Sequence, residues 1–149
     1  MKPRMDPPAV IVVVEDNPFV REMICDWPRR GGHVVHGASS ERAALRLLEQ
    51  GPVDLAIVDL NLHRVDGLSL VRSVESKLAG ASLILITGAV DYEDAAGALS
   101  ASIPVVAMGK PYSFYALEQV VKAALAHRQS EAAAEDEARA GRKSCGGAC

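Results

Sequence analysis

Five polar side chains lie where short apolar runs of the chain end, and together they could bind a divalent cation and a charged group. Glu15 and Asp16 follow the first such run, Asp59 ends another, and Thr87 and Lys110 follow two more. Carboxylate oxygens are preferred ligands of hard cations, whereas a hydroxyl and an ammonium group can hold anionic oxygens. This chemistry requires that the surrounding elements bring the five side chains to one place.

The surrounding sequence alternates between two kinds of segment. Apolar, β-branched runs predict buried strands at 9–14, 33–38, 53–58, 81–86 and 104–108. Helical spacing, with capping residues, predicts helices at 18–30, 41–50, 67–78, 92–100 and 113–125. Such alternation is typical of an α/β fold, and fully apolar strands suit a sheet covered on both faces. We therefore predict a doubly wound, five-stranded parallel sheet of the flavodoxin-like (βα)5 type, with strand order 2-1-3-4-5.

In this topology the polar strand ends meet at one edge of the sheet. The site forms where the strand order reverses, between the first and third strands, which end in Glu15, Asp16 and Asp59. Each pair of carboxylates at roughly 4 Å repels by on the order of 4 kcal/mol at an effective dielectric constant of about 20. Either some of them are protonated or a cation neutralises them. Because the ligands are all oxygen, the expected cation is Mg²⁺.

The remaining two residues indicate what the site could do. Lys110 balances the remaining negative charge and can hold a phosphoryl oxygen, and the Thr87 hydroxyl can donate to another. Asp59 is then the nucleophile and would form an aspartyl-phosphate. Mg²⁺ and Lys110 would stabilise charge on the group in transfer.

Composition sets limits on the partners and on the compartment. The chain has 149 residues and a net charge of −3, which fits one domain and argues against nucleic acid as a partner. No apolar run approaches the ~20 residues of a membrane helix, and the first eight residues do not form a secretory signal. Three cysteines give no disulfide framework. We expect a cytoplasmic protein without membrane contact.

The two ends of the chain differ in composition from the middle. Residues 1–8, rich in proline, are expected to be a disordered arm, and 129–149 a flexible tail rich in Ala and Glu. Cys145 and Cys149 are interpreted as free thiols in that tail. Since about twenty residues follow the last predicted helix, we expect no DNA-binding or enzymatic output domain.

The chain resembles the receiver domain of bacterial two-component response regulators, with residues 9–128 as the domain. The matching segments are Val12–Asn17, Val58–Leu62, Val65–Gly67, Leu85–Gly88 and Lys110–Pro111. The resemblance implies that Asp59 receives a phosphoryl group from a sensor histidine kinase or a histidine phosphotransfer protein. It implies that Glu15, Asp16, Asp59 and the Asn61 backbone carbonyl hold Mg²⁺, and that Thr87 and Lys110 respond to phosphorylation. It also implies a cis Lys110–Pro111 bond.

The same resemblance implies a single-domain regulator, similar to the chemotaxis regulators, that signals by partner binding or phosphorelay. A downstream target would bind the face made by the helix at 92–100, the strand at 104–108 and the last helix, a face that also serves homodimers in the family. The chain departs from the family at Ala107, where an aromatic switch residue is usual, and at His63, where proline is common. Phosphorylation needs neither residue, so the departures concern how the signal reaches the surface.

Two other functions compete with this interpretation. A haloacid-dehalogenase-type phosphatase also uses Asp, Thr or Ser, Lys and Mg²⁺, but its nucleophile ends the first strand in a D-x-D motif that this chain lacks. A receiver-like scaffold that works without phosphorylation would not need a complete acidic set, whereas Ala107 fits it. We therefore expect no enzyme activity beyond self-catalysed phosphoryl transfer and autodephosphorylation.

Overall fold

The computed structural model describes residues 8–60, 67–78, 80–88, 104–126 and 137–138. Several sequence predictions concern residues outside these ranges. They are most of the arm at 1–8 and of the tail at 129–149, the helix at 92–100, the Asn61 carbonyl, and the side chains of His63, Cys145 and Cys149.

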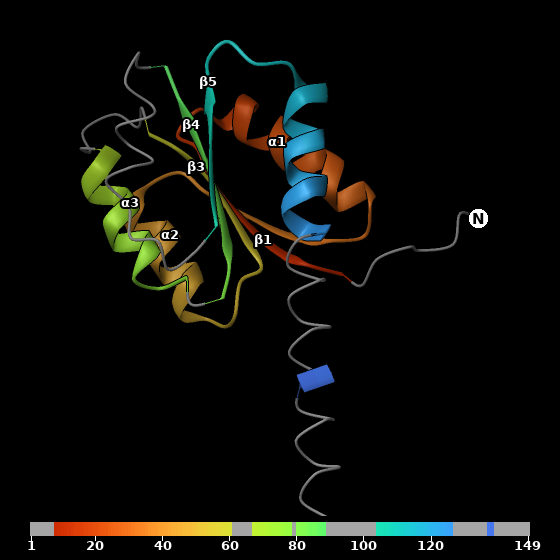
Figure 1. Ribbon diagram of the computed structural model, residues 1–149. Helices are drawn as coiled ribbons and strands as arrows, with labels where there is room; N and C mark the ends of the chain where they lie inside the picture. Colours follow the sequence, from red (N-terminus) through yellow and green to blue (C-terminus); the bar gives the residue numbers. More distant parts are fainter. Residues whose placement is uncertain (1–7, 61–66, 79, 89–103, 127–136, 139–149) are drawn as a thin grey trace, which may run out of the picture.

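The centre of the molecule is a five-stranded parallel sheet with the order β2-β1-β3-β4-β5 (Figure 1). The strands are β1 Val10–Val14, β2 Val34–Ala38, β3 Leu55–Asp59, β4 Ser82–Thr87 and β5 Val105–Gly109. The predicted fold class and strand order are confirmed.

Most strand boundaries lie within one residue of the prediction, and the largest difference, at the start of β3, has a clear reason. β3 was predicted to begin at Val53 but begins at Leu55. The Asp54 carboxylate accepts a hydrogen bond from the backbone N–H of Val10 at 2.7 Å, and the Asp54 N–H donates to the Val10 carbonyl at 2.8 Å. Asp54 thus fastens the entry of β3 to the start of β1 before the regular ladder begins.

Helices cover both faces of the sheet, as the continuous apolar strands predicted. α2 Glu41–Glu49 and α3 Gly67–Glu75 lie on one side, and α1 Pro18–Arg30 and the helix at 114–126 lie on the other (Figure 1). Side-chain caps start three of them, at Asn17, Ser40 and Ser113.

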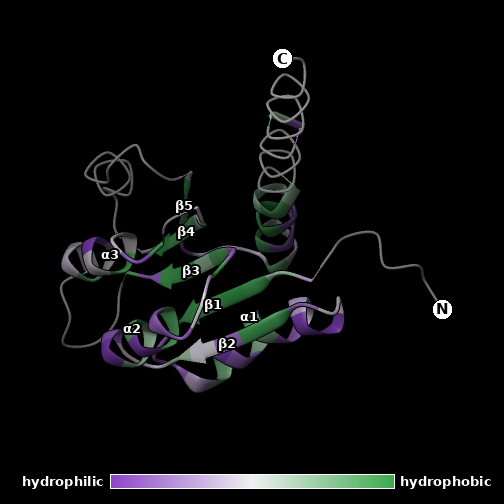
Figure 2. Cartoon of the chain, turned by 90° about the horizontal axis from the view of Figure 1, so that it is seen from below, coloured by the Kyte–Doolittle hydropathy of each residue, from purple (hydrophilic) through white to green (hydrophobic). Residues whose placement is uncertain are grey.

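The strands alternate their side chains between the two halves of the core. Val12 and Val58 pack with α2 and α3, whereas Ile11 and Ile57 pack with α1 and the helix at 114–126. Figure 2 shows this pattern as hydrophobic green strands between helices with hydrophilic purple surfaces. This packing holds the strand ends in fixed positions at the edge of the sheet.

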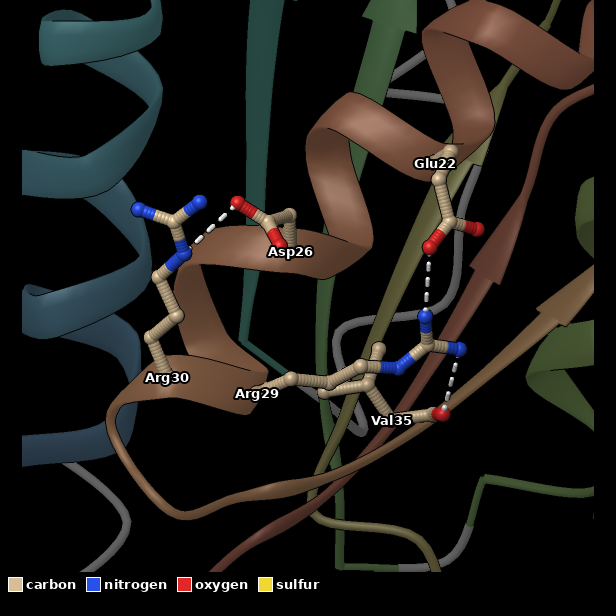
Figure 3. Close-up of polar contacts among 5 residues, drawn as sticks. All are labelled: Glu22, Asp26, Arg29, Arg30 and Val35. Carbon is tan, nitrogen blue, oxygen red and sulfur yellow. Dashed lines mark hydrogen bonds and ion pairs between the residues drawn. The ribbon is translucent and has the colours of Figure 1, made fainter.

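An arginine of α1 covers the outer strand of the sheet (Figure 3). Arg29 donates to the Val35 carbonyl of β2 at 3.2 Å and forms an ion pair with Glu22 at 2.9 Å. β2 lies at an edge of the sheet, where a bare carbonyl would invite pairing with another chain. Arg29 therefore satisfies the Val35 carbonyl and shields this edge of the sheet.

In the part of the chain that the structure describes, no helix has the length and apolar character needed to span a membrane.

Candidate functional site

A polar cleft of about 660 Å³ opens at the edge of the sheet where the strands end. It is lined by Glu15, Asp16, Asn17, Val20, Asp59, Gly88, Lys110, Pro111 and Tyr112. Apart from Val20 of α1, these residues end or closely follow β1, β3, β4 and β5, so the convergence expected from the strand order is present. Four of the five polar side chains singled out in the sequence line the cleft directly.

Asp59 is the last residue of β3 and borders the cleft from its floor. Its Oδ2 lies 2.7 Å from the Lys110 ammonium nitrogen, and the residue is only 2% exposed. The strand end is fixed because Asp59 pairs with Ile86 of β4 and the next N–H, of Leu60, donates to the Ile86 carbonyl at 2.8 Å. A buried carboxylate is thus held at the end of β3, in direct contact with the Lys110 ammonium group.

Glu15 is the second buried acid of the cleft, with 4% exposure. Its Oε1 accepts a hydrogen bond from the Asn17 N–H at 3.1 Å. Burial, followed by a hydrogen bond with Asp59 and the negative charge of Asp59, raises the pKa of Glu15 from 4.5 to about 8, although the hydrogen bond from the Asn17 N–H acts in the opposite direction. The carboxylates therefore repel as the sequence predicted, and in the absence of a cation a proton on Glu15 relieves the repulsion.

Thr87 and Lys110 come to the same edge from neighbouring strands. Thr87 ends β4 with 2% exposure, and its carbonyl accepts a hydrogen bond from the Lys110 N–H at 2.8 Å. Thr87 is not among the lining residues of the cleft, whereas the next residue, Gly88, is. The Lys110–Pro111 bond is cis, as the family resemblance implied.

The residues present fit Mg²⁺, although they do not form a complete cage. Among the described residues, no three His, Cys, Asp or Glu side chains are grouped closely enough to hold a metal ion. Mg²⁺ requires only one or two carboxylates, because water and other oxygens complete its octahedron. The contact with Asp59 contributes to the raised pKa of Glu15, and a cation at this position could take the place of the proton on Glu15. The predicted carbonyl ligand, Asn61, lies outside the described residues.

Three residues of the site were missed in the sequence. Tyr112 lines the cleft, and its pKa is raised by burial and then by the charges of Glu15 and Asp59. Its ring packs edge-on against Phe114 at a centroid distance of 6.0 Å. Val20 also lines the cleft, and Arg21 donates to the Glu15 carbonyl. The position of Tyr112 directly after Lys110–Pro111 could have signalled its role, whereas no local pattern marks Val20 or Arg21.

Comparison with known proteins agrees with this geometry. The family profile of the response regulator receiver domain matches residues 11–122, and the chain belongs to this family. It is thus a receiver domain of the kind found in two-component signalling.

Two response regulators are similar in sequence to part of this chain. It is 34% identical over 91 residues to the transcriptional regulatory protein PhoP of Escherichia coli K12, covering 61% of this chain and 41% of that protein. It is 29% identical over 115 residues to the two-component response regulator PhoP of Pseudomonas aeruginosa PAO1, covering 77% and 51%. The chain therefore spans about half or less of the length of these relatives.

A solved relative resembles about three quarters of this chain. The crystal structure of the response regulator TrrA from Thermotoga maritima, in complex with Mg(2+)-BeF, matches with a TM-score of 0.65 and 26% identity. The match covers 78% of this chain and 99% of TrrA.

Proposed function

We propose that the chain accepts a phosphoryl group on Asp59 from the phosphohistidine of a sensor kinase or a histidine phosphotransfer protein. An Asp59 oxygen attacks phosphorus, a P–O bond forms, and the P–N bond to the histidine breaks. The imidazole nitrogen leaves with the electron pair, and the phosphoryl group remains on Asp59. The observation that carries the proposal is the 2.7 Å contact between Asp59 and Lys110 at the floor of the acidic cleft.

The geometry supports this role because the charges around Asp59 match those of the reaction. Lys110 holds the carboxylate before transfer and can remain with a phosphoryl oxygen afterwards, since its side chain is 36% exposed and extends into the cleft. The Thr87 hydroxyl would donate to another phosphoryl oxygen. Asp59 itself is fixed by the sheet, so the attacking oxygen needs little reorganisation.

Glu15, Asp16, Asp59 and the Asn61 carbonyl would hold Mg²⁺. When bound, the cation supplies positive charge next to the phosphoryl oxygens. The complex of TrrA with Mg(2+)-BeF supports this assignment, since TrrA shares the fold and is 26% identical. The proton that Glu15 carries in the metal-free cleft would then be released.

We further propose that the signal passes to a downstream protein, or onward in a phosphorelay, in the cytoplasm where a kinase would act. The target would bind the face that includes β5 and the helix at 114–126. The same face would pair two copies of the chain in a homodimer. Ala107 lies on β5 opposite Leu85 and packs against the core. A ring at this position is therefore not needed to complete the described core, and the conformational response to phosphorylation has to use other residues.

We propose no enzyme activity beyond phosphoryl transfer to and from Asp59.

The test uses a small phosphodonor, acetyl phosphate, with Mg²⁺ and native mass spectrometry. We expect a labile phosphate adduct on the wild-type chain and none on Asp59→Asn or after chelation of Mg²⁺. Asp26→Asn is the matched control, because Asp26 is an exposed aspartate of α1 whose ion pair is with Arg30. An adduct that survives in Asp59→Asn, or no adduct on the wild type, would refute the proposal.

Two further measurements separate the competing functions. A scaffold that works without phosphorylation would bind its partner equally well before and after treatment with acetyl phosphate. A phosphatase would turn over p-nitrophenyl phosphate many times per chain. We expect phosphorylation-dependent binding and no multiple turnover.

A further inference from the structure

We propose that Arg21 is a positioning residue for the acidic edge of the cleft, and that Gly37 of β2 makes room for it. Arg21 would act through the backbone of Glu15 and Asp16, which presents two of the proposed Mg²⁺ ligands. The inference rests on the proposed Mg²⁺ site, but it concerns residues that do not line the cleft themselves.

The Glu15 carbonyl lies just beyond the end of β1, where the hydrogen bonds of the sheet stop. The Glu15 N–H makes the last bond to β2, donating to the Ala38 carbonyl at 3.0 Å. The chain then leaves the sheet and enters α1. Arg21 donates from Nη1 to the Glu15 carbonyl at 2.9 Å, within this short connection. A charged donor thus fixes the carbonyl of the peptide that joins Glu15 to Asp16.

Arg21 is itself held by the start of α1. Its backbone N–H donates to the Asn17 carbonyl at 2.9 Å, and the Asn17 side chain caps the helix by accepting from Phe19 and Val20. Asn17 also donates its own N–H to the Glu15 carboxylate. The connection is therefore closed from both sides: Asn17 orients the Glu15 side chain, and Arg21 orients the Glu15 backbone.

Because Gly37 has no side chain, the Arg21 side chain can pass close to the backbone of β2. A Cβ built on Gly37 would lie 3.0 Å from Cδ, 3.2 Å from Cγ and 3.4 Å from Nε of Arg21. Glycine weakens a strand interior and often marks a close approach by another group. Gly37 pairs with Val13, two residues before Glu15, so the close approach is next to the connection that Arg21 fixes. A methyl group here would require the arginine stem to shift by a few tenths of an ångström, which changes the position from which Nη1 reaches the Glu15 carbonyl.

Calorimetric titration with Mg²⁺ tests this inference, using Arg21→Gln and Gly37→Ala. Loss of groups that orient metal ligands lowers affinity by about 10- to 100-fold, and we expect about tenfold weaker Mg²⁺ binding in both variants. Arg21→Lys, which keeps the charge, should recover part of the affinity. At saturating Mg²⁺, phosphorylation by acetyl phosphate should return close to the wild-type rate, since Asp59 and Lys110 are untouched.

Matched controls are Arg30→Gln, which alters an exposed arginine of the same helix, and Gly51→Ala, whose new Cβ would meet no atom within 4 Å. Both should bind Mg²⁺ like the wild type. Amide spectra of the metal-free proteins give a second readout, with shifts expected at Asp16 and Asn17 in the two test variants. Wild-type affinity in either Arg21→Gln or Gly37→Ala would overturn the inference. Failure of the wild type to bind Mg²⁺ would instead refute the proposed function.

Discussion

The contact between Lys110 and Asp59 predicts opposite effects of removing its two members from the metal-free protein. Asp59 is the buried partner, with a side chain 3% exposed, whereas the Lys110 side chain is 36% exposed. Lys110→Met leaves a buried carboxylate beside Glu15 without its ammonium partner. Asp59→Asn removes the buried charge itself, and Lys110 can then reach water.

The size of each effect follows from burial. Breaking a fully buried ion pair costs about 3–5 kcal/mol, and an exposed pair about 0–1 kcal/mol. With one partner buried and the other partly exposed, we expect Lys110→Met to lower the free energy of unfolding by about 2 kcal/mol. Asp59→Asn should leave it unchanged or raise it by about 1 kcal/mol, because Asp59 contributes to the raised pKa of Glu15 and its replacement lowers the cost of keeping Glu15 protonated at neutral pH.

Urea unfolding in EDTA at neutral pH measures these differences. In the double variant, Lys110→Met should cost less than about 0.5 kcal/mol, because its target charge is gone. Lys77→Met is the matched control: Lys77 lies 3.7 Å from Glu49 with both side chains exposed, so its loss should cost under about 1 kcal/mol. Equal costs of Lys110→Met with and without Asp59→Asn would refute the reasoning, as would strong destabilisation by Asp59→Asn alone.

Two further predictions concern Glu15 and Arg29. The folded protein keeps a proton on Glu15 up to its pKa of about 8, whereas the unfolded chain loses that proton near 4.5. The titration of Glu15 therefore makes the stability of the metal-free protein fall as the pH rises from 4.5 to about 8. Urea unfolding in EDTA along a pH series should show the fall, and Glu15→Gln should remove it; a Glu15→Gln curve parallel to the wild type would contradict the assignment. Arg29→Ala should cost about 1 kcal/mol and speed amide exchange in β2, because the Val35 carbonyl loses its donor. Arg30→Ala, from the same turn of α1, is the control, and equal effects of the two substitutions would contradict the role given to Arg29.

The sequence predicted the fold and most of the cleft because both follow from patterns that are local. Each strand is a short apolar run, and the 2-1-3-4-5 order places the ends of those runs at one edge. Asp59 and Lys110 are 51 positions apart, yet their contact could be expected because each ends its own strand. Residues that directly follow strands are therefore the part of the site that a sequence reveals.

Other features depend on side chains that cross between elements. Arg21 of α1 approaches Gly37 of β2 closely, and no residue spacing in either segment predicts this contact. The pKa of Glu15 depends on how deeply the cleft buries it, which differs from position to position along one edge. The start of β3 depends on the Asp54 carboxylate and its bond to Val10. These are tertiary effects, and they decide how the cleft works rather than where it is.

The acidic cleft lowers the stability of the metal-free fold, and this property suits a switch. Among the described residues, two buried acids, Asp59 and Glu15, lie beside the partly exposed ammonium group of Lys110. The stability of such a fold changes with any change in charge at the cleft. Each added cation or phosphoryl group alters the electrostatic interactions among the same three side chains. A neutral cleft of the same shape would be more stable and less responsive. In the absence of an aromatic residue at 107, this charge balance at Asp59 is the part of the described structure that phosphorylation would change directly.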